Sequence, residues 1–356
     1  MPYCTGGESV ASDVAHNWLL YIAAFASAFG ISLVTTPLAK KISIKLGGID
    51  YPKDRGLHKE PLPRMGGIAI VLGFMLTMFI LLPFIPEMRT MQFAGFIVAA
   101  LIIVILGMFD DIHNLSSKLK LAVQIVAALI VIYSGTRINV VSWPYFASLE
   151  MMSAPITLIW IIGVTNAVNL IDGVDGLAAG VSSIAALCLA FLCVLSGNPM
   201  AVFFTTTLAG SCWGFLPRNF SPAELIMGDT GATFLGFALA VSSIIGVYKA
   251  YALLAVLISV FAIALPIFDT LFAMLRRALN GRPIMEADRG HLHHRLIDSG
   301  LSHKQAVIVM YCISIFCAII SILIAVRDYR AVIVVFVFVL VCFLMTYVYR
   351  KRVNDR

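Results

Sequence analysis

Long apolar runs separated by short polar segments dominate the chain. Each run is continuous and close to the roughly 20 apolar residues that a helix needs to cross a bilayer. Their limits are 18–38, 66–86, 92–109, 118–135, 154–171, 177–196, 199–217, 231–248, 252–273, 305–326 and 331–349. A membrane β-barrel would instead show segments of about ten residues with alternating character. We therefore expect an all-α, polytopic transmembrane helix bundle of ten to eleven spans.

Composition supports the membrane class. The 356 residues are 60% hydrophobic and only 12% charged, against about 25% charged in soluble proteins. Six of the seven cysteines lie inside apolar runs without redox or zinc spacing, which excludes a disulfide framework. We expect one transmembrane domain over 18–349, with an extracytoplasmic leader at 1–17 and a basic cytoplasmic tail at 350–356. The first run lacks the basic flank and cleavage site of a signal peptide.

Charge sets the expected orientation in the membrane. If the N-terminus lies outside, twenty of the 25 Lys and Arg residues fall in cytoplasmic segments and five fall outside. Cytoplasmic loops of membrane proteins carry this excess of basic residues, so we expect the N-terminus outside and the C-terminus in the cytoplasm. The net charge of +6 suits anionic lipid headgroups and phosphorylated substrates, and no feature calls for nucleic acid.

With this orientation, the acids, amides and histidines of four loops distant in sequence fall on the cytoplasmic face. In chain order they are Asp110, Asp111, Asn166, Asn169, Asp172, Asp175, Asn219, Asp229, His291, His293 and His294. Such convergence on one face is typical of a substrate site. Transporter sites, by contrast, usually lie near the middle of the bilayer.

The aspartates predict a bound cation. Asp110 and Asp111 end a predicted helix, where the helix dipole disfavours negative charge by roughly 0.3–1 kcal/mol each. Adjacent carboxylates also repel each other unless a cation lies nearby. A solvated helix end beside Lys118 and Lys120 is the alternative for this pair alone. Because the candidate ligands are all oxygen donors, we expect Mg²⁺, with Mn²⁺ as a substitute.

Several of these residues have a structural alternative. Asn166 could belong to a polar seam between helices, and Asp229 or Thr230 could cap the helix that follows Met-Gly-Asp-Thr-Gly. Asp269, near the inner end of the ninth run, could pair with an arginine of the same segment. The His-x-His-His motif lies among arginines, which suits phosphate better than metal, or it could be a solvated surface.

Five motifs together resemble the polyprenyl-phosphate N-acetylhexosamine-1-phosphate transferase family, in its bacterial WecA/TagO type. The resemblance runs from about Thr36 to Leu301. The motifs are Pro63-Arg64-Met65-Gly66-Gly67, Gly107-Met108-Phe109-Asp110-Asp111, Asn166 through Ala178, Met227-Gly228-Asp229-Thr230-Gly231, and His291-Leu292-His293-His294-Arg295. Each is weak alone, but five in order on the expected side of the membrane are specific.

The resemblance implies a reaction and a set of roles. Undecaprenyl phosphate would attack the β-phosphate of UDP-GlcNAc and release UMP, starting a surface glycan such as teichoic acid or O-antigen. Asp229 and Asn169 would hold Mg²⁺, and Asp110, Asp111 and Asp172 would be catalytic, with the choice of base between Asp110 and Asp111 open. The implied substrate-binding residues are Asp175, Asn166, Asn219, Lys120, His58, Lys59, His291, His293, His294 and Arg295.

The resemblance also bears on the sugar, the location and the alternatives. His-Leu-His-His-Arg is similar to GlcNAc-type members, whereas the muramoyl-pentapeptide branch has three consecutive histidines followed by Glu. Ile226 replaces the aromatic residue that often stacks on uracil. The active site would lie on the cytoplasmic face of a bacterial inner membrane, and a homodimer is left open. A phospho-MurNAc-pentapeptide transferase and, in another class, a secondary transporter are the competing interpretations.

Overall fold

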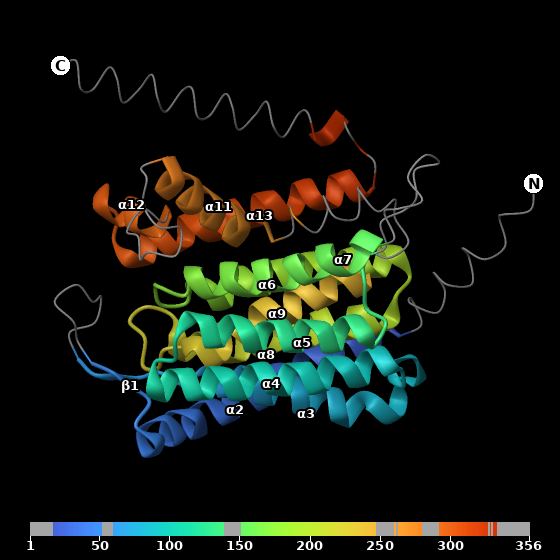
Figure 1. Cartoon of the computed structure of the whole chain (residues 1–356), viewed down its shortest axis with the longest axis horizontal. Helices are drawn as coiled ribbons and strands as arrows, with labels where there is room; N and C mark the ends of the chain where they lie inside the picture. Colours follow the sequence, from blue (N-terminus) through green and yellow to red (C-terminus); the bar gives the residue numbers. More distant parts are fainter. Residues whose placement is uncertain are drawn as a thin grey trace, which may run out of the picture.

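Helices of the chain lie side by side in a bundle, seen from the side in Figure 1. The computed structural model describes residues 17–51, 60–138, 151–246, 260, 263–279, 292–326, 328 and 330–332. Its helices are α2 (Trp18–Leu46), α3 (Gly67–Leu81), α4 (Met91–His113), α5 (Ser117–Tyr133), α6 (Ser153–Ile171), α7 (Leu177–Ser196), α8 (Pro199–Asn219), α9 (Gly228–Gly246), α11 (Ala264–Leu279), α12 (Leu292–Asp298) and α13 (His303–Ala325). Two 3₁₀ turns, Leu82–Phe84 and Pro86–Met88, follow α3.

Within the described residues, eight helical segments are long and apolar enough to cross a membrane, one of them α3 together with the 3₁₀ turn Leu82–Phe84. This confirms the helical, polytopic class. Among the remaining predicted spans, 118–135 corresponds to α5, whose 17 residues are at the short limit for a span. Only part of 252–273, around α11, and the first residues of 331–349 lie in the described part of the chain. The count of ten to eleven spans and the orientation therefore stay predictions. Residues 1–16 and 333–356 lie outside the description.

Two local features differ from the expectation. The first span was expected to end near residue 38, but α2 continues to Leu46, with Pro37 inside it, and Gly47 ends it in the left-handed conformation. A membrane helix tolerates proline when neighbouring groups satisfy the freed backbone. The all-α prediction also missed a two-stranded antiparallel sheet of β1 (Ile49–Asp50) and β2 (Leu62–Pro63). Strands of two residues are too short to show a period of two.

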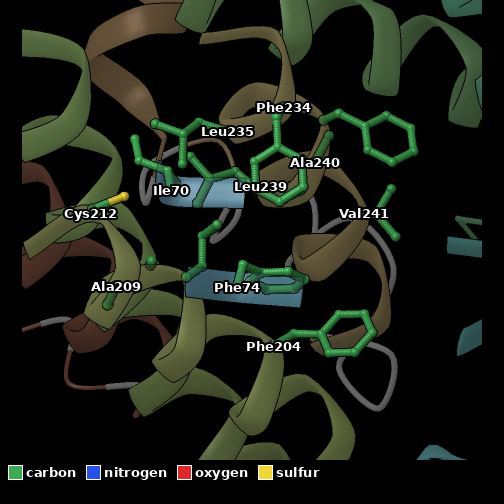
Figure 2. Packing of buried hydrophobic residues seen from close by; sticks show 14 of the residues in the cluster. Ile70, Phe74, Phe204, Ala209, Cys212, Phe234, Leu235, Leu239, Ala240 and Val241 are labelled. Atoms are coloured by element: carbon green, nitrogen blue, oxygen red, sulfur yellow. The ribbon is translucent and has the colours of Figure 1, made fainter. Parts of the chain in front are cut away.

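Helix α9 is the centre of the bundle. Every residue of α9 except Asp229 is buried, and the helix packs against α4, α6, α7, α3 and α8. Phe74 of α3 contacts Phe234 of α9 and Phe204 of α8 edge to face, at centroid distances of 5.5 and 6.0 Å (Figure 2). Offset and edge-to-face ring pairs of this kind add roughly 0.5–1.5 kcal/mol beyond their area burial. This aromatic layer fixes the axial position of α9 and hence of Asp229 at its start.

Glycines bring the helices close together. On α8, Gly210 and Gly214 lie four residues apart against α2, where an added Cβ would come within 2.3 Å of the carbonyl oxygens of Phe25 and Phe29. This is the small-xxx-small contact of membrane helices. At the start of α9, a Cβ on Gly107 of α4 would lie 2.5 Å from the Cα of Thr230. Glycine thus lets the ends of α4 and α9 meet at the candidate site.

Candidate active site

The first turn of α9 carries the candidate metal ligand and is capped from another helix. Asp111, at the end of α4, accepts hydrogen bonds from the backbone N–H groups of Asp229 (2.8 Å) and Thr230 (3.0 Å) and from the Thr230 hydroxyl (2.6 Å). The cap that the sequence suggested for Asp229 or Thr230 therefore comes from Asp111. This leaves the Asp229 side chain free of a capping role in its own helix.

Asp229 instead points at groups from three other segments. Its Oδ2 lies 2.7 Å from Nη2 of Arg64 and 3.9 Å from Nζ of Lys120. Its Oδ1 accepts a hydrogen bond from the amide of Asn169, in the last turn of α6. The Asp229 side chain is 13% exposed, so this carboxylate lies at the edge of the buried bundle, where a ligand can still reach it.

Asp110 is the second carboxylate of the cluster and is almost fully buried. Its Oδ1 accepts the backbone N–H of Leu115 at 2.7 Å, just after the end of α4. Its Oδ2 contacts the ammonium group of Lys120, from the first turn of α5. The two oxygens of Asp110 thus bind the loop after α4 and the first turn of α5, which holds Lys120 beside Asp229.

The end of α6 adds a further acid. Asp172 follows the last residue of α6, and its backbone N–H bonds to the carbonyl of Asn169. Burial, and then the negative charges of Asp229 and Asp111, raise the pKa of the half-buried Asp172 to about 8. Four acids, Asp110, Asp111, Asp172 and Asp229, share this region with the cations Arg64 and Lys120. An added cation would relieve the excess negative charge.

Comparison with known proteins now decides the family. The family model described as glycosyl transferase family 4 matches residues 93–247, which include all four of these aspartates. A probable undecaprenyl-phosphate N-acetylglucosaminyl 1-phosphate transferase of Bacillus subtilis is 40% identical over 80% of this chain and 81% of its own length. The chain belongs to this family of N-acetylhexosamine-1-phosphate transferases.

More distant members extend the same match. A decaprenyl-phosphate N-acetylglucosaminephosphotransferase of Mycolicibacterium smegmatis is 33% identical, covering 79% of this chain and 76% of its own. An undecaprenyl-phosphate alpha-N-acetylglucosaminyl 1-phosphate transferase of Escherichia coli is 25% identical, covering 76% and 75%. Family membership confirms the resemblance drawn from the five motifs and favours a transferase over the transporter.

The residues of this transferase fit a magnesium ion that relies on substrate for some of its ligands. Within the described ranges, no three His, Cys, Asp or Glu side chains form a ready-made metal site. Mg²⁺ typically takes one or two carboxylates and fills its shell with substrate phosphates and water. Asp229 and Asn169, which touch each other, supply a carboxylate and an amide oxygen of this hard-donor type. The metal assignment stays a prediction.

Three predicted substrate residues bind the protein itself in this structure. The Asn166 amide pairs with Gln124 of α5 at 2.8 Å, as expected for a polar seam between helices. Asn219 accepts the N–H of Gly176 at 3.1 Å and donates to the carbonyl of Leu225 at 3.0 Å. Asp175 accepts the N–H of Ala223 at 3.1 Å. The last two contacts shape the loop that leads into Met-Gly-Asp, so they support the site from behind.

The basic residues of the last loop are described only in part. Asp269 of α11 accepts the backbone N–H of Leu292 at 2.7 Å, which anchors the start of α12, and Arg295 of that helix is exposed. The side chains of His293 and His294 lie outside the description. So do His58, Lys59 and His291 altogether. Their substrate-binding roles remain predictions.

Arg64 is the site residue that sequence reasoning did not assign. It lies in the first of the five motifs, which by itself indicates only the family resemblance. Its guanidinium contacts both Asp111 (Nε, 3.2 Å) and Asp229 (Nη2, 2.7 Å). Arginine stays charged at every physiological pH. An arginine predicted at the cytoplasmic end of a span, where the acidic motifs also gather, could therefore have been assigned to the site from sequence.

Proposed function

We propose that the protein transfers GlcNAc-1-phosphate from UDP-GlcNAc to undecaprenyl phosphate, releasing UMP and forming undecaprenyl-diphospho-GlcNAc. The observation that carries the proposal is the meeting of Asp110, Asp229, Asn169 and Lys120 from four helices at one end of the bundle. Relatives named for N-acetylglucosaminyl 1-phosphate transfer to polyprenyl phosphates support the donor and the acceptor class.

The reaction is a displacement at the β-phosphorus of the donor. An oxygen of the acceptor phosphate forms a bond to this phosphorus, and the bond to the bridging oxygen breaks, so that UMP leaves with the electron pair. The bond between the sugar and its phosphate stays intact. The acceptor is a phosphate monoester with a second pKa of about 6, so at pH 7 an ionised oxygen is available. The protein therefore needs to orient that oxygen more than it needs to remove a proton from it.

Positioning and charge stabilisation dominate phosphoryl transfer, and the residues divide that work. We assign the metal to Asp229 and Asn169; when bound, Mg²⁺ would neutralise negative charge on the diphosphate. Lys120 lies between Asp110 and Asp229 and offers its ammonium to phosphate oxygens. Asp110 would orient the acceptor phosphate through Lys120, because direct contact between two anions is unfavourable. The family resemblance implies that Asp172 and Asp175 lie near the uridine of the donor.

The excess of basic residues in the predicted cytoplasmic segments supports an active site on the cytoplasmic face of the bacterial inner membrane. Undecaprenyl phosphate would reach the site from the bilayer, and UDP-GlcNAc from the cytoplasm. The His-Leu-His-His-Arg motif favours GlcNAc over the MurNAc-pentapeptide donor.

Purified protein in detergent tests this function directly. With Mg²⁺, undecaprenyl phosphate and UDP-GlcNAc labelled in the sugar, label should move into the organic-extractable lipid. Unlabelled UDP-MurNAc-pentapeptide at equal concentration should compete poorly. Absence of labelled lipid from folded, monodisperse protein would refute the proposed reaction, and transfer from a labelled UDP-MurNAc-pentapeptide donor in its place would correct the sugar.

A further inference from the structure

The main chain at Arg64 is fixed between two other segments. On one side, the Arg64 N–H donates to the carbonyl of Gly48 at 2.8 Å. On the other side, Pro63 accepts the N–H of Ile226 at 2.9 Å, and the N–H of Gly66 donates to the carbonyl of Ile226 at 2.8 Å. The segment that carries Arg64 is therefore bonded directly to the segment that leads into Asp229. A surface arginine would not need such a fixed backbone.

The side chain of Arg64 uses all three guanidinium nitrogens on protein acceptors. Nε lies 3.2 Å from Oδ1 of Asp111, Nη2 donates to Oδ2 of Asp229 at 2.7 Å, and Nη1 donates to Oδ1 of Asn114 at 3.2 Å. The planar guanidinium presents its donors in a rigid fork that suits several acceptors at once. Arg64 thereby joins the end of α4 to the first turn of α9.

Asp111 binds both Arg64 and the first turn of α9. Its side chain is fully buried, and its two oxygens accept two backbone N–H groups and one hydroxyl of α9 in addition to the contact with Arg64. Those oxygens are thus committed to α9 and Arg64, whereas Asp110 faces Lys120. The two adjacent aspartates therefore have different surroundings and different tasks.

We infer that Arg64 is a positioning residue, which together with Asp111 fixes the Asp229 carboxylate in the orientation that binds the metal–diphosphate. This inference rests on the proposed function. Burial disfavours the charged guanidinium, but the carboxylates of Asp229 and Asp111 outweigh it and raise the pKa of Arg64. Arg64 acts through Asp229 and does not itself need to touch the substrate.

A substrate-contact role for Arg64 makes a different prediction from a positioning role. If Arg64 bound a phosphate, Arg64→Lys would keep the charge and much of the function, mainly raising the KM for UDP-GlcNAc. If Arg64 positions Asp229, lysine fails, because a single ammonium on a flexible stem cannot hold three acceptors. Arg64→Lys should then weaken metal binding as strongly as Arg64→Gln does.

The test combines turnover with direct metal binding. Mn²⁺ binding is followed by its EPR signal, with saturating UDP-GlcNAc and no lipid acceptor, so that no reaction occurs. We expect Arg64→Lys and Arg64→Gln to lower kcat at least 30-fold and to weaken Mn²⁺ binding at least fivefold, with KM for UDP-GlcNAc at saturating metal changing less than threefold. Matched controls are Arg89→Lys and Arg89→Gln, since the exposed Arg89 side chain bonds, among described residues, only to the carbonyl of Pro83, and Arg89 lies beside the start of α4 whereas Asp110 and Asp111 lie at its end.

A second variant, Asn114→Gly, tests the inference even if the Arg64 variants do not fold. Asn114 has a positive φ of 50°, which glycine adopts readily, so Asn114→Gly removes one acceptor of Arg64 at little backbone cost. It should weaken Mn²⁺ binding about two- to threefold in well-folded protein. Unchanged Mn²⁺ affinity in both Arg64→Lys and Asn114→Gly overturns the inference. If wild-type protein transfers no sugar phosphate, the proposed function itself fails.

Discussion

Lys120 and Asp110 form the pair on which the stability of the site depends most directly. Asp110 is 1% exposed, and one of its oxygens contacts Lys120, whose side chain is 28% exposed. Lys120→Met would leave a buried carboxylate without its cation. Breaking a buried pair costs about 3–5 kcal/mol. Because water reaches part of the Lys120 side chain, we expect a loss of about 2–3 kcal/mol in the free energy of unfolding.

A double-mutant cycle isolates the pair. In Asp110→Asn, the backbone N–H of Leu115 keeps an oxygen acceptor and position 110 carries no charge, so adding Lys120→Met should then cost less than about 1 kcal/mol. The coupling free energy should therefore be about 1–3 kcal/mol, measured by chemical unfolding in mixed micelles. The matched control is the Arg218–Glu224 pair, 41% and 54% exposed, with an expected coupling below about 0.5 kcal/mol. Equal coupling in the two pairs would refute a buried ion pair at the site.

Three further predictions concern the metal and the membrane. Asp229→Asn should lower turnover at least 100-fold while the protein stays folded, because Asp111 and not Asp229 caps α9; near-normal turnover would remove Asp229 from the metal site. Activity should vanish in EDTA and return with Mg²⁺ or Mn²⁺, and full turnover in excess chelator would contradict a metal requirement. In a cysteine-free background, a cysteine at exposed Lys118 should react with membrane-impermeant thiol reagents only from the cytoplasm, and one at Arg89 only from outside; the reverse labelling would overturn the orientation.

The helices were predictable because each apolar run is long and continuous. The run 177–196 coincides with α7, and 154–171 begins one residue after α6 does. Span ends were harder where charge and proline suggested a stop, as at Pro37, since packing against α3 and α8 carries α2 two turns further. The small sheet was not predictable, because each strand has only two residues and pairs with a segment twelve or more residues away in the chain.

The site was predictable in its residue types but not in its contacts. The sequence groups Asp110 with Asp111, yet one carboxylate faces Lys120 and the other accepts the backbone N–H of Asp229, 118 residues later in the chain. Local sequence suggested the cap for Asp229 or Thr230 because capping is usually a local interaction. Arg64 was missed for the same reason, since its role depends on the meeting of α4 and α9 with a segment that precedes α3.

The fate of the β-phosphate tests the central claim most directly. UDP-GlcNAc labelled with ³²P in the β-position and incubated with the protein and undecaprenyl phosphate distinguishes transfer of the sugar phosphate from transfer of the sugar alone. We predict that the label enters the lipid product in a one-to-one ratio with released UMP. Label that stays in the aqueous phase as UDP while sugar enters the lipid would contradict displacement at the β-phosphorus.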